Sequence, residues 1–164
     1  PFPPLPQADA RMFTEASTYT EDFYWGVTES EQWTEQFQDD RVSAASTAEY
    51  GNFWSFGKHL FFNTEAPDTF KAKLPLHSSD AGSYPFDLFY TTGPDYGQCE
   101  LWMNGEKLCE WDGFNKNEVV RKHLTSQKPM QIAPENNILE IRVVGKNVES
   151  TGFLAGMDCV RLKG

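Results

Sequence analysis

Alternating apolar and polar residues mark the second half of this chain as rich in β-strands. The clearest case lies between Gly93 and Cys109, with the sequence GPDYGQCELWMNGEKLC. After an opening turn, residues of two kinds alternate along the chain: Cys99, Leu101 and Met103 on one face, Glu100 and Trp102 on the other. Alternation with a period of two, bounded by turn residues, is typical of a half-buried strand.

The dipeptide Asn104-Gly105 predicts a tight reversal after this strand, because both residue types tolerate positive φ. A two-residue loop would place Cys99 opposite Glu110 and put Cys99 and Cys109 on opposite faces. A three-residue loop, with Gly105 as the bulge residue, would place Cys99 opposite Cys109. The sequence leaves both loops open, and with them a disulfide. Because the chain has three cysteines, at least one is unpaired, and the protein is not a disulfide scaffold.

Further segments with strand patterning surround this hairpin: residues 59–63, 69–76, 84–92, 128–133, 137–144 and 153–162. In the last of them, Met157 and Cys159 are expected on the face opposite to Asp158, Val160 and Leu162. About eight or nine short strands separated by turns predict an all-β fold, a β-sandwich of the jelly-roll type.

The N-terminal part is less regular. Residues 1–8 are proline-rich and are expected to be a linker remnant, which leaves residues 9–164 as a single domain. Residues 18–57 form a long excursion with little strand patterning. Within it, residues 29–37 have apolar positions at helical spacing and acidic residues near their start, which predicts one short helix. A stretch of this length is either functional or packed down by its own side chains.

Charge excludes two classes of partner. The formal net charge is −10, whereas binding to a phosphate backbone needs a concentrated Lys and Arg surface. We therefore expect neither nucleic acid nor an anionic membrane as a partner. The chain also lacks a run of about 20 apolar residues, the length that crosses a bilayer.

Aromatic residues make up 15% of the chain, with five Trp and thirteen Phe. Sugar rings have apolar C–H faces and a fringe of hydroxyls, so a sugar site needs exposed aromatic platforms with amides and carboxylates nearby. Trp102 is the leading candidate, unless residues 18–57 cover its sheet face. Three further tryptophans are candidate sugar-binding residues: Trp111, Trp54 and Trp25. Trp111 lies close to a loop, where its ring has a chance of exposure. Trp25 and Trp54 lie in irregular segments beside glycines, where the alternative is a small core of their own.

A known family matches the layout of the second half. The motifs are GPDYG, WMNGEKL, WDGF, NILEIRVVGKN, STGFLAGMD and CVRL, within residues 58–164. Together they resemble the galactose-binding-like jelly-roll carbohydrate-binding modules found beside catalytic domains in bacterial polysaccharide-degrading enzymes. The resemblance implies a structural calcium held by Glu15 and Asp158, since this hard cation takes several oxygen ligands. It also implies that Asn147 binds a sugar hydroxyl.

Signatures of catalysis are weak. The three histidines have no pair at metal-ligand spacing, and neither a Gly-x-Ser-x-Gly elbow nor a Gly-rich phosphate loop is present. The sequence therefore favours a non-catalytic carbohydrate-binding module, secreted or at the cell surface, that holds a catalytic domain of the same parent chain on a polysaccharide. The acidic charge favours neutral or cationic glycans. The alternatives are a small glycoside hydrolase or polysaccharide lyase on the same scaffold, and a protein-interaction β-sandwich without a sugar site.

Overall fold

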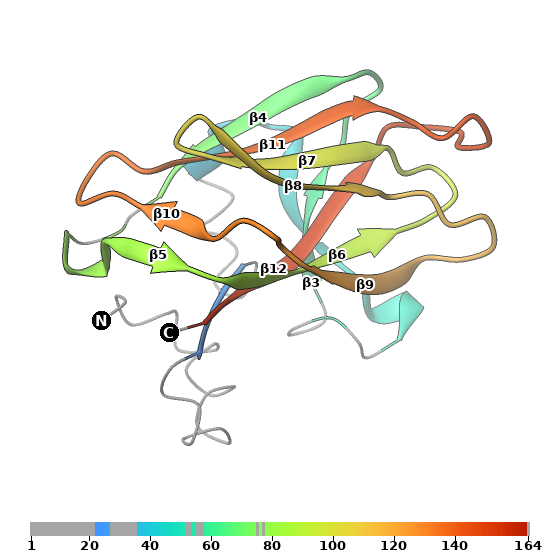
Figure 1. Cartoon of the computed structure of the whole chain (residues 1–164). Coiled ribbons are helices and arrows are strands. Elements are labelled where there is room, and N and C mark those ends of the chain that lie inside the picture. Colours follow the sequence, from blue (N-terminus) through green and yellow to red (C-terminus); the bar gives the residue numbers. More distant parts are fainter. Residues whose placement is uncertain are drawn as a thin grey trace.

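The strands pack face to face in two layers (Figure 1). The computed structural model describes residues 22–26, 36–51, 54, 58–74, 76 and 78–163. The predicted linker over residues 1–8 and nearly all of the predicted helix over residues 29–37 lie outside these described residues. The all-β sandwich that the strand patterning predicts is confirmed.

One layer, the β12 sheet, has the order β2-β3-β12-β6-β9, and β1 also pairs with β12. Its strands are β1 (Asp22–Gly26), β2 (Val42–Ser46), β3 (Lys58–Phe62), β6 (Phe86–Thr92), β9 (Val120–Thr125) and β12 (Ala155–Lys163). All of its pairings are antiparallel. A short 3-10 turn, η2 (Ala48–Tyr50), follows β2.

The other layer, the β11 sheet, has the order β4-β11-β7-β8. Its strands are β4 (Asp68–Lys73), β7 (Gln98–Met103), β8 (Glu106–Asp112) and β11 (Ile138–Gly145). A two-stranded ladder of β5 (Gly82–Tyr84) and β10 (Met130–Ile132) lies at one end of the sandwich, and η4 (Ser78–Asp80) precedes β5.

The core lies between the two sheets and follows the predicted alternation. In β7, the residues expected on the apolar face are buried, while Glu100 and Trp102 are only partly covered. In the β12 sheet, Leu60 and Leu88 are fully buried and belong to the same apolar cluster. Because side chains alternate across a strand, the neighbours of these leucines in β3 and β6 face outward from the sandwich.

The β7–β8 hairpin has the two-residue loop, with a bulge that the sequence did not predict further along β8. Asn104 and Gly105 both have positive φ, 51° and 84°, and Met103 pairs with Glu106, as a two-residue loop requires. A register shift then leaves Leu108 out of the ladder, which places Cys99 opposite Trp111. Neither predicted register of Cys99 is therefore correct, and all three cysteines are free.

A second irregularity changes the faces of β12. Against β6, the register shifts between Met157 and Cys159, so Asp158 is an extra residue in the strand. A bulge of this kind reverses the faces of the residues beyond it. Met157 and Val160 consequently both point into the core. The prediction that Met157 shares a face with Cys159 was wrong for this reason.

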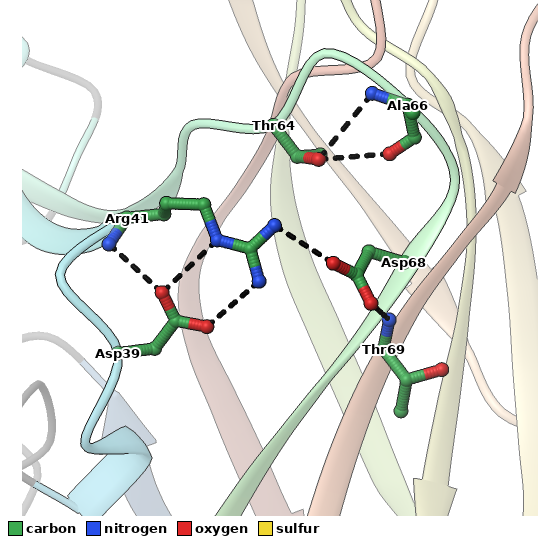
Figure 2. Close-up of polar contacts among 6 residues, drawn as sticks. All are labelled: Asp39, Arg41, Thr64, Ala66, Asp68 and Thr69. Carbon is green, nitrogen blue, oxygen red and sulfur yellow. Dashed lines mark hydrogen bonds and ion pairs between the residues drawn. The ribbon is translucent and has the colours of Figure 1, made fainter.

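Arg41 joins the edges of the two sheets (Figure 2). Its guanidinium bonds Asp39 ahead of β2 at 2.8 Å and Asp68 at the start of β4 at 2.7 Å. It also lies 4.7 Å from the centre of the Phe70 ring. Hydrogen bonding to Arg41 lowers the pKa of both carboxyls. The pair is exposed and contributes little free energy, but it fixes the start of β2, which goes on to form a wall of the site.

Two neighbouring valines of β11 test the placement of the core. Val143 is 2% exposed and Val144 is 49% exposed. We expect Val143→Ala to lower the free energy of unfolding by about 2 kcal/mol, since it removes buried methyl groups and leaves a cavity. The matched variant Val144→Ala changes it by about 0.5 kcal/mol at most. Urea unfolding measures both, and equal losses would contradict the assigned register of β11.

Candidate functional site

Trp102 lies on the outer face of the β11 sheet, as predicted, but one face of its ring is covered. The guanidinium carbon of Arg142 lies 3.6 Å from the ring centre, within the range of a cation–π contact. The indole N–H donates to Glu100 at 2.9 Å, and Lys107 pairs with the same carboxylate. Trp102 is therefore part of a network of charged side chains within its own sheet.

The expectation that Trp54 and Trp111 are exposed needs correction. Trp111 is 7% exposed and packs in the core against Tyr90, with ring centres 5.5 Å apart. Trp54 is 3% exposed. Neither ring offers an open face to a ligand. Trp25 is in β1, where it pairs with Val160 of β12.

Asn147 stabilises its own loop. Its Oδ1 accepts the backbone N–H of Glu149 at 3.0 Å, and its Nδ2 donates to Asp112 at 3.4 Å. Both bonds are local to the loops that follow β8 and β11. The predicted contact between Asn147 and a sugar hydroxyl stays a prediction.

Asp158 already has a cationic partner. It is fully buried, and its Oδ2 accepts a hydrogen bond from Nε of Arg121 at 2.6 Å. The guanidinium of Arg121 lies 4.2 Å from the centre of the Phe89 ring. Glu15 lies outside the described residues, and the described part of the chain holds no group of three or more His, Cys, Asp or Glu suited to a metal ion. The expected calcium at Glu15 and Asp158 stays a prediction, because one of its two ligands lies outside the described residues.

A pocket of about 450 Å³ opens elsewhere, at the outer edge of the β12 sheet. It lies between β2, η2 and β3 on one side and the turn after β6 on the other. In Figure 1 this is the end of the sandwich where the chain leaves β6, β8 and β11. Its polar and aromatic lining consists of Ser46, Tyr50, His59, Phe61, Asp95 and Tyr96.

Aromatic rings form much of the pocket lining. Tyr50, at the end of η2, is 40% exposed and packs against Trp54, with ring centres 6.2 Å apart. The Phe61 ring stacks on His59 at 5.5 Å and lies 6.4 Å from Tyr96. Tyr50, Phe61 and His59 were not among the residues expected from the sequence to bind a ligand. Strand alternation could have identified two of them, because it turns His59 and Phe61 outward on either side of the buried Leu60.

The turn over residues 93–97 is a rigid wall of the pocket. Gly93 donates its backbone N–H to Gly113 at 2.8 Å, and Gly97 donates to Leu154 at 2.8 Å. The Ser150 hydroxyl donates to the Tyr96 carbonyl at 2.8 Å. These bonds tie the turn to two neighbouring loops before any ligand arrives, which lowers the entropic cost of binding.

The charge of the pocket is negative. In the described part of its lining, Asp95 is the one charged side chain. A hydrogen bond to the Glu49 carboxylate is the main reason that the pKa of the Tyr50 hydroxyl lies above its usual value. Burial raises the pKa of Tyr96. Both phenols are therefore neutral at physiological pH, and the Tyr50 oxygen can still accept a hydrogen bond.

A scan against protein-family models finds no match, and a search of curated protein sequences finds none either. Solved structures do match. A xanthan lyase from Paenibacillus is 23% identical with a TM-score of 0.61, over 77% of this chain and 12% of that chain. A β-(1,4)-mannanase of Podospora anserina, described as GH26-CBM35, is 10% identical with a TM-score of 0.52, over 87% of this chain and 27% of that chain.

The insecticidal crystal protein Cry2Aa is 13% identical with a TM-score of 0.50, over 87% of this chain and 21% of that chain. Further matching structures include carbohydrate-binding modules of families 6, 35 and 36. The matches with the xanthan lyase, the mannanase and Cry2Aa agree with the expected β-sandwich fold. This chain spans only a small part of the length of the three larger proteins.

The partner of Asp158 leads to a prediction about metal. We expect the same thermal unfolding midpoint with calcium and with a chelator, because Arg121 supplies the positive charge. Arg121→Ala should lower the free energy of unfolding by about 3 kcal/mol, since it leaves a buried carboxylate without this partner. The control Arg41→Ala, at an exposed pair, should lower it clearly less, since exposed ion pairs contribute little. A midpoint lowered by chelator would instead support calcium at Glu15 and Asp158.

The pocket wall depends on the lack of a side chain at position 93. A Cβ on Gly93 would lie 2.8 Å from the Tyr96 ring and 3.2 Å from Val119. Gly93→Ala should lower the free energy of unfolding by roughly 1–3 kcal/mol, the usual cost of overpacking. At Gly145 a Cβ would meet only the end of the Gln98 side chain, at 3.2 Å. Gly145→Ala is therefore the control, and an equal loss in both variants, measured in urea, would refute the packing of this wall.

Proposed function

We propose that this chain is a non-catalytic carbohydrate-binding domain whose ligand site is the pocket between β2, β3 and the 93–97 turn. The observation that carries the proposal is the partly exposed Tyr50 ring beside Phe61 in a preformed pocket of about 450 Å³. Pockets that bind small ligands are largely apolar and aromatic, with a few polar groups that fix orientation. Such a domain holds an attached enzyme on its polysaccharide and raises the local concentration of substrate.

The lining has the chemistry that a sugar requires. Tyr50 and Phe61 offer ring faces for the C–H face of a pyranose. Ser46, His59 and Asp95 add polar groups for its hydroxyls. Asp95 and the net charge of −10 disfavour sulfated or uronate-rich polymers, because like charges repel. Neutral or cationic polysaccharides are the proposed ligands.

A binding role is favoured over hydrolysis by the groups that the pocket lacks. Glycosidases use two carboxyl groups about 5–5.5 Å or 6.5–9.5 Å apart, and Asp95 is the one carboxylate in the described lining. Burial lowers the pKa of His59 to about 4, which makes it a poor general base near neutral pH. Release of reducing sugar from any polysaccharide would refute the binding-only assignment.

The setting of the domain is part of the proposal. We place it outside the cell, beside a catalytic domain of the same parent chain. The described helices include none long and apolar enough to span a membrane. The Paenibacillus and Podospora structures support the arrangement, because in each a matching segment forms only part of a polysaccharide-degrading chain.

A second candidate site is the outer face of the β11 sheet at Trp102. The observation in its favour is that Arg142 lies over only one of the two faces of the Trp102 ring. The pocket is preferred because its aromatic rings line a cavity, whereas Trp102 is engaged with Glu100 and Arg142 on a sheet face. The third alternative, a protein-interaction domain, predicts no glycan binding at all.

Affinity electrophoresis against neutral, cationic and anionic polysaccharides tests these sites. With a neutral polysaccharide that retards the wild-type protein, we expect Tyr50→Ala to weaken binding about tenfold, since a lost stacking contact costs roughly 1–2 kcal/mol. Trp102→Ala is the matched control on the sheet face and should leave retardation unchanged. The reverse pattern would move the site to Trp102, and no retardation of the folded protein by any polymer would refute the proposed function.

A further inference from the structure

A chain of hydrogen bonds ends at the histidine of the pocket. The indole Nε1 of Trp54 lies 2.8 Å from the hydroxyl oxygen of Thr91, and Nδ1 of His59 lies 2.7 Å from the same oxygen. The Thr91 side chain on β6 is fully buried, and His59 on β3 is 3% exposed. The three residues come from different parts of the chain, and the fold brings them together behind the pocket.

The direction of these bonds follows from the chemistry of the groups. An indole N–H can only donate, so the Thr91 oxygen accepts from Trp54. The hydroxyl then has one proton left to donate. Within the described part of the chain its remaining partner is Nδ1 of His59. If Nδ1 carried a proton, the Thr91 proton would be a buried donor without an acceptor, which is an unfavourable arrangement.

The packing turns one edge of the imidazole inward. A Cβ placed on Gly156 of β12 would lie 2.6 Å from Nδ1 and 2.9 Å from Cε1 of His59. The Nδ1 edge therefore faces Thr91 and the backbone of β12, and only a glycine at position 156 leaves room for it. His59 nevertheless lines the pocket. Its second ring nitrogen, Nε2, has no hydrogen-bond partner within the described residues.

We propose that His59 donates a hydrogen bond from Nε2 to a sugar hydroxyl in this pocket. Trp54 and Thr91 hold its imidazole in place in the neutral form. The inference rests on the proposed function and narrows it: the ligand presents a neutral hydroxyl or ring oxygen as acceptor at this position. Trp54, which the sequence suggested as a direct sugar contact, acts instead as a positioning residue. A neutral imidazole brings no positive charge to offset the negative Asp95 nearby, so the pocket as a whole still repels carboxylate and sulfate groups.

The low pKa of His59 agrees with this state. Burial lowers the pKa to about 4, so the ring is uncharged across the physiological range. Protonation would also place a second proton between Nδ1 and the Thr91 hydroxyl and break the bond that orients the ring. Asp95 and the phenols of Tyr50 and Tyr96 are the titratable groups that share the pocket lining with it.

Long-range ¹H–¹⁵N NMR spectra of the histidine rings test the tautomer without any ligand. Near neutral pH we expect the His59 signals, assigned by their loss in His59→Gln, to show the Nε2–H tautomer. Thr91→Val removes the hydroxyl at nearly constant shape and should yield a mixture of tautomers. The matched control is Thr92→Val on the next residue, whose hydroxyl bonds the Val120 carbonyl and which should leave the spectrum unchanged. An Nδ1–H tautomer in the wild-type protein would overturn the proposal.

Affinity electrophoresis with the retarding polysaccharide tests the contact itself. His59→Gln keeps an N–H donor at about the position of Nε2 and should retain binding, whereas His59→Leu should weaken it about tenfold, the loss of one hydrogen bond to a buried donor. Thermal unfolding confirms that both variants are folded. Equal binding by His59→Leu and wild type would overturn the hydroxyl contact. Absence of binding by the wild type would instead refute the proposed function, while the NMR result still decides the tautomer.

Discussion

The single layer of apolar side chains between the two sheets is the constraint on which the rest of this molecule depends. Leu60 and Phe62 of β3 and Leu88 of β6 are fully buried in it. Because a strand alternates its side chains, burying these residues turns His59, Phe61 and Thr91 to the opposite face. The hydrogen bond between His59 and Thr91 behind the pocket, and the Phe61 ring within it, thus follow from the way β3 and β6 contribute to the core.

The outer face of the β12 sheet carries buried charge that is compensated locally. Asp87 pairs with Arg161 and with Lys163, and Asp158 pairs with Arg121. Burial raises the pKa of Asp87, but Thr125, Lys163 and Arg161 together lower it below its usual value. The stability from this carboxylate is present at neutral pH and is lost on acidification through its folded pKa. In the pocket, by contrast, Asp95 has no cationic neighbour within the described lining. The proposed ligand therefore faces an uncompensated negative charge on this carboxylate.

The sequence predicts the core well and the site poorly, for physical reasons. Alternation in β7 and β11 identifies the buried residues, because it records directly which face meets the other sheet. The bulges at Leu108 and Asp158 leave no such mark, and each shifts the register of the residues beyond it. β9 is missed because it is an edge strand with polar residues on both faces. The pocket joins η2, β3 and the 93–97 turn, which only the topology brings together, and tryptophan content draws attention to Trp111 and Trp54, which the fold buries.

The proposed site lies at the end of the sandwich, between β3 and the 93–97 turn. Titration of the ¹⁵N-labelled protein with a soluble neutral oligosaccharide, monitored by amide and indole chemical shifts, tests this location most directly. We expect the shifts to concentrate at Tyr50, Phe61 and Tyr96, while the Trp102 indole signal stays in place. Shifts centred on Trp102 and Arg142, with the signals of the pocket unchanged, would contradict a site in the pocket.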